Sequence, residues 1–317
     1  MLDKIADTII KSDTIAILPH VASDGDALGS SFALALVLSD IGKKVDVLLE
    51  EDVPLLYSFL PGKNLSKVYV KNDIHYSLAL ALDCGDIERL GCRRDLFDRA
   101  DHTVNIDHHN TNTKFAVQNY IDTASSSTGE IIYMLLGKMG QKIGTDAAVN
   151  LYIAISTDTG GFRYSNTGAR THLITSELIS RGVNVAEISQ IVFDTTSYEK
   201  VKLTGAAIQS IELVEDGRIA VMALSNETIR NAGAREEDSD GIINIARNIR
   251  GVEVAIMLRQ MDSGDIKVNL RSNKYVDVSA VAGRYSGGGH KRAAGFTTAG
   301  DLEQLKTTLL QDLRKEL

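Results

Sequence analysis

Short apolar runs alternate with amphipathic stretches through the first half of the chain. The pattern predicts buried strands at residues 14–18, 44–49, 75–82 and 103–106, and helices at residues 27–41 and 130–139. Residues 147–155 form a further apolar stretch that fits either a helix or a strand. Strands spaced by helices indicate a mainly parallel sheet with helices on both faces. Ligands bind such sheets beyond the carboxyl ends of the strands.

From about residue 206 the pattern changes to strands that are joined by short turns. Strands are predicted at residues 211–214, 219–223, 252–258 and 266–270, and a final helix at residues 302–317. We therefore expect an α/β domain over residues 1–185, a linker over residues 186–205, and a smaller α/β domain with a mixed sheet over residues 206–317.

Composition limits the classes of partner. The chain has 317 residues, a net charge of −8, and two cysteines, Cys84 and Cys92, which are too few for a disulfide framework. We find no secretory signal at the N-terminus and no apolar run long enough to span a membrane. These features predict a cytoplasmic protein with no membrane partner. The negative net charge argues against a protein that binds long duplex nucleic acid. It favours a protein that acts on small substrates or that has a local basic pocket.

The first candidate ligands follow the strand at residues 14–18. His20, Asp24 and Asp26 lie within seven residues, and Gly25 and Gly29 are expected to let the backbone turn tightly before the helix. One aspartate is enough to cap a helix, and a second carboxylate adds repulsion unless a cation compensates. The segment therefore favours metal binding over capping alone.

Three more segments end apolar runs with acidic or imidazole side chains. They carry Asp83, the triplet Asp107, His108 and His109, and Asp158. Because all four segments are expected at the same edge of the sheet, their charges would repel one another without a cation. Carboxylate and imidazole donors suit divalent Mn, Fe, Co or Mg. Two such ions about 3.5–4 Å apart activate a water and bind the oxygens of a phosphoryl group.

A serine-rich segment precedes the helix at residues 130–139. Ser127 and Glu130 have the spacing of a capping box, and Ser125, Ser126 and Thr128 stand beside them. The pattern leaves two interpretations open: helix capping alone, or capping together with a phosphate contact.

These four segments resemble the DHH phosphoesterase family. The matching motifs are H-x-x-x-D-x-D-x-x-G-S from His20, D-C-G-D at Asp83, D-H-H at Asp107, and Asp158 with its following glycines. The resemblance implies that one metal binds His20, Asp24 and Asp83. It implies a second metal on Asp26, Asp83, His108 and Asp158, so that Asp83 bridges the two. His109 would face the substrate and Asp107 would orient it, which makes Asp83, Asp107, His108 and His109 the catalytic group. The expected ions are two Mn²⁺, for which Mg²⁺ or Co²⁺ could substitute.

The second half resembles the DHHA1 domain that accompanies this family. The glycine-rich run Gly287, Gly288, Gly289 and His290 can expose backbone N–H groups to an anion. The family places a substrate-binding Arg-Ser pair where Arg271 and Ser272 stand. Residues 250–292 hold eight lysines and arginines against four acids, which locates a basic pocket in this half.

The domain content resembles the nanoRNase/pAp-phosphatase type. Such enzymes hydrolyse short single-stranded RNA or DNA, or small nucleotides such as 3′-phosphoadenosine 5′-phosphate (pAp), and the resemblance makes a homodimer plausible. A phosphodiesterase of pApA or cyclic di-AMP is the main alternative. A RecJ-like exonuclease would need further modules, and a manganese inorganic pyrophosphatase has another C-terminal domain. A non-catalytic nucleotide-binding protein would be expected to lack at least one ligand.

Overall fold

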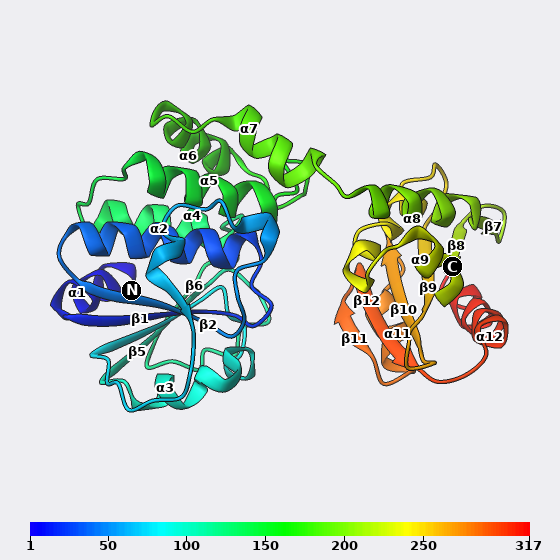
Figure 1. Cartoon of the computed structure of the whole chain (residues 1–317), viewed down its shortest axis with the longest axis horizontal. Helices are drawn as coiled ribbons and strands as arrows, with labels where there is room; N and C mark the ends of the chain where they lie inside the picture. The colour runs from blue at the N-terminus through cyan, green and yellow to red at the C-terminus, as the bar shows by residue number, and fades with distance from the viewer. The chain divides into compact units, whose positions relative to one another are not determined.

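The computed structural model describes residues 1–317 and divides them into two compact units, Met1–Thr195 and Thr196–Leu317 (Figure 1). Each unit has its own six-stranded sheet and its own hydrophobic cores. Most of the expected linker at residues 186–205 is helical. Helix α7 (Val185–Ser189) continues into a π-helical turn (Gln190–Asp194), and only residues 195–197 lack regular structure before α8 (Tyr198–Gln209).

The N-terminal unit contains an entirely parallel sheet. Its strand order is β3-β2-β1-β4-β5-β6. The strands are β1 (Thr14–Pro19), β2 (Lys44–Leu49), β3 (Ser66–Val68), β4 (Leu78–Leu82), β5 (His102–Asp107) and β6 (Gln118–Ile121). The parallel α/β architecture expected from the sequence is confirmed. Because β2 and β4 lie on opposite sides of β1, the sheet has a switch point between β1 and β4, where ligands of such sheets bind.

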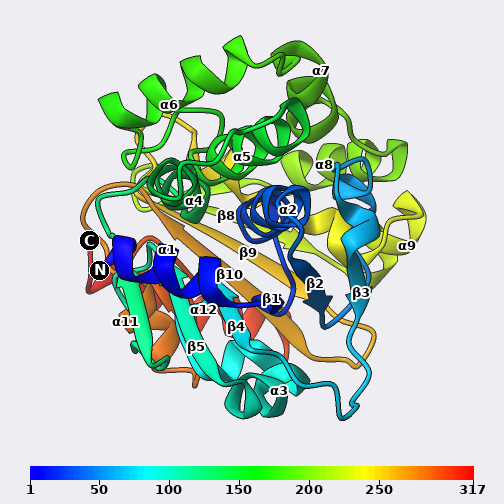
Figure 2. The same ribbon diagram turned by 90° about the vertical axis from the view of Figure 1, so that its left-hand side faces the viewer.

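Helices cover both faces of this sheet. Ile15 and Ile17 of β1 belong to the core under α1, α2, α4 and α5, whereas Ala16 and Leu18 belong to the core under α3. Figure 2 shows the strands between these two layers. The helices are α1 (Leu2–Lys11), α2 (Gly25–Asp40), α3 (Arg94–Arg99), α4 (Thr128–Lys138), α5 (Thr145–Asp158) and α6 (Ala169–Ser180).

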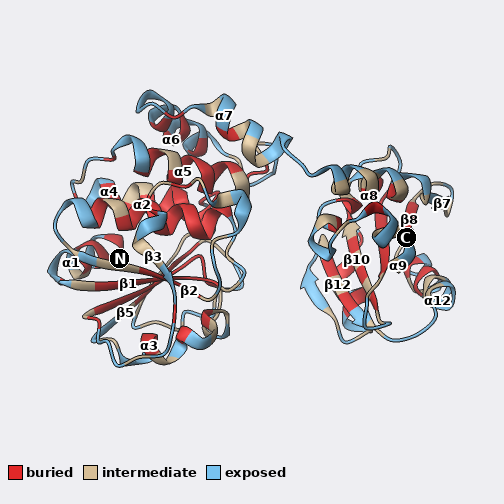
Figure 3. Ribbon diagram, viewed as in Figure 1, coloured by how far each residue is buried: buried red, intermediate tan, exposed pale blue.

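Helices α2 and α5 are largely buried (Figure 3). The apolar stretch at residues 147–155, which the sequence left open, is thus part of a helix. Gly25 and Gly29 lie inside α2 and have no positive φ, so the expectation that they make a turn is wrong. A Cβ on Gly29 would lie 2.5 Å from the carbonyl oxygen of Asn150 in α5. These glycines allow close helix packing, and Ala22 (φ 53°) makes the turn before α2.

The C-terminal unit has a mixed sheet, as the sequence predicted. Its order is β11-β12-β10-β9-β8-β7, in which β8 and β9 are parallel and the other pairs antiparallel. The strands are β7 (Glu212–Val214), β8 (Ile219–Leu224), β9 (Val254–Gln260), β10 (Ile266–Ser272), β11 (Gly288–His290) and β12 (Ala293–Thr298). The remaining helices are α9 (Asn226–Ala232), α10 (Ile243–Arg247), α11 (Val278–Gly283) and α12 (Leu302–Arg314).

No helix in either unit combines the length and the apolar character that crossing a membrane requires.

Candidate metal centre

The carboxyl ends of three neighbouring strands bring the first three motifs together. Pro19 pairs with Leu82, and Leu82 pairs with Ile106, so the residues that follow them stand side by side at one edge of the sheet. The fourth segment, which the sequence left open between helix and strand, is helical, and Asp158 ends helix α5 with its carboxylate facing His108. A carboxylate at the negative end of a helix dipole is unfavourable, which adds to the need for a cation.

His20 faces two of the aspartates. Its Nε2 lies 3.7 Å from Asp24 Oδ1 and 3.6 Å from Asp83 Oδ2. Its Nδ1 lies 2.7 Å from the carbonyl oxygen of Val21 and 2.9 Å from Arg89 Nη2. A proton on Nδ1 satisfies the first contact and leaves the Nε2 lone pair free for a metal ion, whereas a hydrogen bond from Arg89 to Nδ1 would need the other tautomer.

His108 faces three carboxylates, one of which, Asp83, also faces His20. Its Nε2 lies 3.7 Å from Asp83 Oδ1 and 3.6 Å from Asp158 Oδ2, and Asp26 Oδ2 is 3.9 Å away. This nitrogen is buried and has no hydrogen-bond partner. Donor atoms about 2.1 Å from one octahedral ion are about 3.0–4.2 Å apart. The spacing and the unpartnered nitrogen therefore fit a divalent cation shared by these side chains.

Asp83 stands between the two groups. Its Oδ2 faces His20, and its Oδ1 faces His108. Its backbone has φ 56°, a strained conformation for a residue other than glycine, and such strain is common at functional sites. The hydroxyl of Thr128 donates to Oδ1 at 3.0 Å. A carboxylate in this position can serve two cations at once.

The electrostatics of the cluster also favour bound cations. Burial is the main cause that raises the pKa of Asp26, Asp83 and Asp158, and neighbouring carboxylates raise all three further. For Asp158 the pKa rises to about 6. Their anionic forms are thus unstable in this environment unless positive charge is supplied.

The Asp107 carboxylate holds His109. Asp107 Oδ1 lies 2.8 Å from His109 Nδ1 and accepts from the backbone N–H of His108 at 2.8 Å. The hydrogen bond to Asp107 is the main cause that raises the pKa of His109 to about 9. Asn112 donates to Asp107 Oδ2 at 2.6 Å, a contact that the sequence did not reveal.

Asp24 and Asp26 each cap a helix, but not the same one. Asp24 Oδ1 accepts from the N–H groups of Asp26 and Ala27 at the start of α2. Asp26 accepts from the N–H groups of Thr128 (2.7 Å) and Gly129 (2.8 Å) at the start of α4. Capping and metal binding, which the sequence analysis treated as alternatives, are thus compatible in the same side chains.

The serine-rich segment caps α4 and orients the cluster. Ser127 Oγ accepts from the N–H of Glu130 at 3.1 Å, and Ser126 Oγ donates to the Glu130 carboxylate at 2.6 Å. Ser125 donates to Asp122, and Thr128 donates to Asp83. All four side chains are buried, so the structure favours capping over the added phosphate contact.

The sequence analysis also missed Arg89, which follows the D-C-G-D motif. Its Nη2 lies 2.9 Å from His20 Nδ1, and its carbonyl oxygen accepts from Val21 N–H at 2.9 Å. The only signal in the sequence for a role of Arg89 is its position three residues after Asp86.

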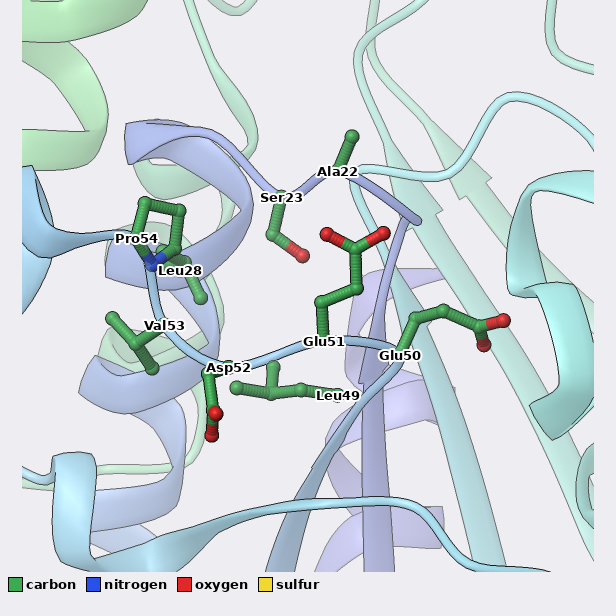
Figure 4. Close-up of a pocket in the computed structure, with 9 residues that line it drawn as sticks. All are labelled: Ala22, Ser23, Leu28, Leu49, Glu50, Glu51, Asp52, Val53 and Pro54. Carbon is green, nitrogen blue, oxygen red and sulfur yellow. The ribbon is translucent and has the colours of Figure 1, made fainter.

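A small cavity of about 30 Å³ lies beside the turn that carries His20 (Figure 4). Glu50, Glu51 and Asp52 line one side, and Figure 4 shows the Glu51 carboxylate pointing toward the turn at Ala22 and Ser23. The volume suits a single water molecule, and the acidic lining repels phosphate.

The glycine-rich run of the C-terminal unit forms an exposed hairpin. Gly288, Gly289 and His290 make up β11, an edge strand that pairs only with β12. Gly289 has φ 141°, and a Cβ there would lie 2.5 Å from the carbonyl oxygen of Ala293. Nothing lies within 4 Å of a Cβ placed on Gly288. The outer edge of β11 is therefore open to a ligand.

Arg271 and Ser272 end β10 at the same end of the sheet as His290, because Ala293 pairs with both Arg271 and His290. Arg271 Nη1 donates to the carbonyl oxygen of Leu270 at 3.0 Å. Ser272 is buried, and its hydroxyl donates to the carbonyl oxygen of Val276 at 2.7 Å. The serine thus closes the loop that follows β10.

Comparison with known proteins agrees with this geometry. Residues 14–155 match the model described as the DHH family, N-terminal domain, and residues 216–317 match the DHHA1 domain. The bifunctional oligoribonuclease and PAP phosphatase NrnA of Thermus thermophilus is 32% identical over 96% of this chain and 90% of its own length. The chain belongs to the DHH family of phosphoesterases. The N-terminal unit is accordingly its DHH unit and the C-terminal unit its DHHA1 unit.

Two further relatives of the DHH protein match most of its length. The NrnA of Bacillus subtilis, also named a bifunctional oligoribonuclease and PAP phosphatase, is 29% identical over 93% of this chain and 92% of its own. The crystal structure of an exopolyphosphatase-related protein from Bacteroides fragilis superposes with a TM-score of 0.92 at 27% identity, and covers 99% of this chain and 95% of that one.

Proposed function

We propose that this protein is a two-metal phosphoesterase that hydrolyses short oligonucleotides and pAp. The position of Asp83 carries the proposal, because its two oxygens face the separate groups around His20 and His108. The substrate classes come from the names of the relatives, which are oligoribonucleases and PAP phosphatases.

Two sets of side chains are available for cations. His20, Asp24 and Asp83 would hold one, and Asp26, Asp83, His108 and Asp158 the other. Divalent cations at such a site supply an activated water and neutralise charge on the phosphoryl oxygens. Carboxylate and imidazole donors suit Mn²⁺, and Mg²⁺ or Co²⁺ are the expected substitutes.

His109 is proposed to act on the substrate. The contact with Asp107 raises its pKa, which favours a protonated ring that can donate a hydrogen bond or a proton to an oxygen of the phosphate or of the leaving group. Asp107 positions the ring through the 2.8 Å contact at Nδ1. Asp107 therefore acts through His109 and not on the substrate itself.

The DHHA1 unit is proposed to bind the terminal phosphate of the substrate. Gly287, Gly288, Gly289 and His290 would provide exposed N–H groups and an imidazole, and Arg271 a guanidinium at the same end of the sheet. Ser272 would support the site by holding the neighbouring loop through Val276.

We further propose that the enzyme works in the cytoplasm as a homodimer. Both cysteines are free thiols, and Cys92 is exposed, which suits a reducing compartment. The homodimer rests on the family resemblance alone.

A substrate panel tests the proposed activity. With added Mn²⁺ we expect phosphate release from pAp and cleavage of RNA from dinucleotide to pentanucleotide, measured by chromatography. Parallel reactions with pApA, cyclic di-AMP and pyrophosphate separate the alternatives. Hydrolysis of pyrophosphate without any cleavage of pAp or RNA would overturn the proposal.

The variant Asp83→Asn tests the metal centre. Asparagine tolerates the left-handed backbone at this position and keeps an oxygen for Thr128, but it loses the shared negative charge. We expect kcat with Mn²⁺ to fall at least about a hundredfold while the circular dichroism spectrum stays unchanged. Asp86→Asn in the same motif is the control, since Asp86 caps only the turn at Arg89. Full activity of Asp83→Asn would refute a shared role for this carboxylate.

A further inference from the structure

An open concavity of about 550 Å³ lies at one end of the DHHA1 sheet. It is formed by the residues that precede β8 and β9 and by the loop that follows β10. We call it the basic pocket, and its polar lining consists chiefly of Arg218, Arg247, Asn248, Asn273, Lys274 and Tyr275.

The three cations of the basic pocket have no acidic partner. Several other arginines of the unit pair with an acid, among them Arg259 with Glu236 and Arg314 with Glu215. In contrast, Arg218 donates only to the carbonyl oxygen of Glu215, and Arg247 only to the side chain of its neighbour Asn248. Three uncompensated positive charges around one hollow attract an anion, even though the chain as a whole carries a charge of −8.

The one acidic residue in the lining is already engaged by backbone. Glu253 is 4% exposed, and its carboxylate accepts from the N–H groups of Lys274 (3.1 Å), Tyr275 (2.7 Å) and Val276 (2.9 Å). Its charge is thus offset within the loop. The same hydrogen bonds fix the loop that carries Lys274 and Tyr275.

Tyr275 gives the basic pocket an aromatic surface. Its side chain is 52% exposed, while its backbone is held by Glu253. Single-stranded nucleic acids bind where cationic grooves meet aromatic rings on which a base can stack. Cations and an exposed ring in one hollow therefore fit a nucleotide better than an isolated phosphate.

The basic pocket lies at the same sheet end as the glycine-rich hairpin. Arg292 in the turn of the hairpin donates to the carbonyl oxygen of Val276, so the hairpin rests on the loop that also lines the basic pocket. In the strand order, β10 is two strands from β11 and β8 is four. At a strand spacing of about 4.8 Å these separations are about 10–19 Å, which a substrate longer than one nucleotide would span.

We infer that the basic pocket is a second nucleotide subsite, which binds an internal phosphate and a base of a short single-stranded oligonucleotide. This inference rests on the proposed function, in which the terminal phosphate binds at residues 287–290. It adds that oligonucleotides depend on the basic pocket, whereas pAp, which ends after one nucleoside, does not.

The pocket variant Arg218→Gln/Arg247→Gln/Lys274→Gln tests the inference. The probe is a penta-adenylate with a 3′-fluorescein label, and its binding to the full chain is followed by fluorescence anisotropy in EDTA over a range of salt concentrations. Each lost phosphate contact lowers the slope of log K against log salt by about 0.7. We expect the slope to fall by about 0.7, for the one internal phosphate that the subsite binds, and the affinity at low salt to fall at least about tenfold.

The control variant is Arg230→Gln/Arg235→Gln/Lys267→Gln. It removes the same charge from α9, the residues after it and the first half of β10, at the opposite end of the sheet. Its salt slope should match that of the wild type. Equal slopes for the pocket variant and the control variant would overturn the inference.

Tyr275 provides an independent test. We expect Tyr275→Ala to weaken binding of the penta-adenylate and Tyr275→Phe to restore it, because phenylalanine keeps the ring face. Neither variant should change the KM for pAp. If Tyr275→Ala binds the penta-adenylate as strongly as the wild type does, no base stacks on this ring, and the inference is overturned.

Hydrolysis by the wild type separates this inference from the proposed function. If the wild type cleaves neither pAp nor the pentanucleotide with Mn²⁺, the proposed function fails, and anisotropy still decides whether the basic pocket binds. If the wild type cleaves both and the pocket variant has an unchanged KM for both, the proposed function stands and the subsite fails.

Discussion

At the scale of single residues, side chains of the metal centre have two roles at once. Asp26 accepts from two N–H groups of α4, and it also faces His108. A substitution at Asp26 would therefore disturb the start of α4 as well as the metal centre. Asp158 is a cleaner probe, because the one hydrogen bond to its carboxylate comes from Asn166.

Asp158 tests the repulsion within the cluster. Burial raises the pKa of Asp158 from 3.8 to about 6, so folding favours its protonated form. In EDTA the free energy of unfolding should therefore fall as pH rises from about 4 to about 6, by an amount on the order of 2 kcal/mol. In Asp158→Asn the free energy of unfolding should no longer show the part of this decrease that comes from Asp158. Urea denaturation of both proteins at a series of pH values measures it.

Saturating Mn²⁺ should reverse the sign of this effect. Metal ligands bind in their ionised form, so the stabilisation by Mn²⁺ should grow as pH rises through about 6 in the wild type, and less steeply in Asp158→Asn, in which Asp26 and Asp83 still lose protons on binding. Asp146→Asn, in the exposed first turn of the same helix, is the control and should follow the wild type. A wild-type stability in EDTA that does not change between these pH values would contradict the account.

The sequence could indicate the candidate ligands but not their supports. His20, Asp83 and His108 stand out because they follow buried apolar runs at one sheet edge. The role of Thr128 could not be assigned, since its hydrogen bond to Asp83 joins residues far apart in the chain. Asn112 is close to Asp107 in the chain, but the loop between them has no periodic pattern from which their contact could be predicted. The contacts that orient the ligands depend on tertiary packing, which hydrophobic periodicity does not predict.

At the scale of elements, the contact between α4 and α5 depends on a glycine. A Cβ on Gly129 would overlap the Cβ of Ala154. The N–H of Gly129 also donates to Asp26, so the helix cannot shift away without loosening a metal-site carboxylate. Packing of the helical layer and geometry of the metal centre are therefore linked.

Gly129→Ala should destabilise the DHH unit by about 1–3 kcal/mol, because the added methyl group overpacks the interface. Gly137→Ala in the same helix is the matched control. Nothing lies within 4 Å of a Cβ there, so this change should stabilise by up to about 1 kcal/mol. Urea denaturation measures both. Adding Ala154→Gly to Gly129→Ala should recover part of the loss, and no recovery would show that another contact is responsible.

Three of the strands that the sequence did not predict share a physical feature. Strands β3, β6 and β11 bury none of their side chains, so no hydrophobic pattern marks them. Strand β11 consists of two glycines and a histidine, and it exists through backbone pairing with β12. Helix α5 was ambiguous for the opposite reason, because burial on nearly all sides removes its helical period.

At the scale of the whole molecule, all proposed metal ligands lie in the unit Met1–Thr195. Since each unit has a separate core, calorimetry should show that Mn²⁺ raises the melting temperature of one transition only. At a hundredfold excess over the dissociation constant, bound ions add about 2.7 kcal/mol per site. Asp83→Asn should reduce this shift. A single transition that moves as a whole with Mn²⁺ would contradict the independence of the units.

Composition located the positive charge of the second half only in part. Residues 250–292 are rich in basic side chains, but Arg259 is paired with Glu236, Arg284 with Glu316, and Arg292 donates to backbone carbonyls. Two cations of the basic pocket, Arg218 and Arg247, lie outside that segment. A count of charges cannot separate paired from unpaired side chains, because pairing is set by the fold.

The buried carboxylates described above have a consequence for the living cell. Asp26, Asp83 and Asp158 resist ionisation where they stand, so the DHH unit is weakest when divalent ions are scarce. A marginally stable native state opens more often and is removed by proteases. If the candidate site holds divalent ions in the cell, scarcity of those ions should therefore shorten the lifetime of this polypeptide, and its abundance should follow the supply of the metal.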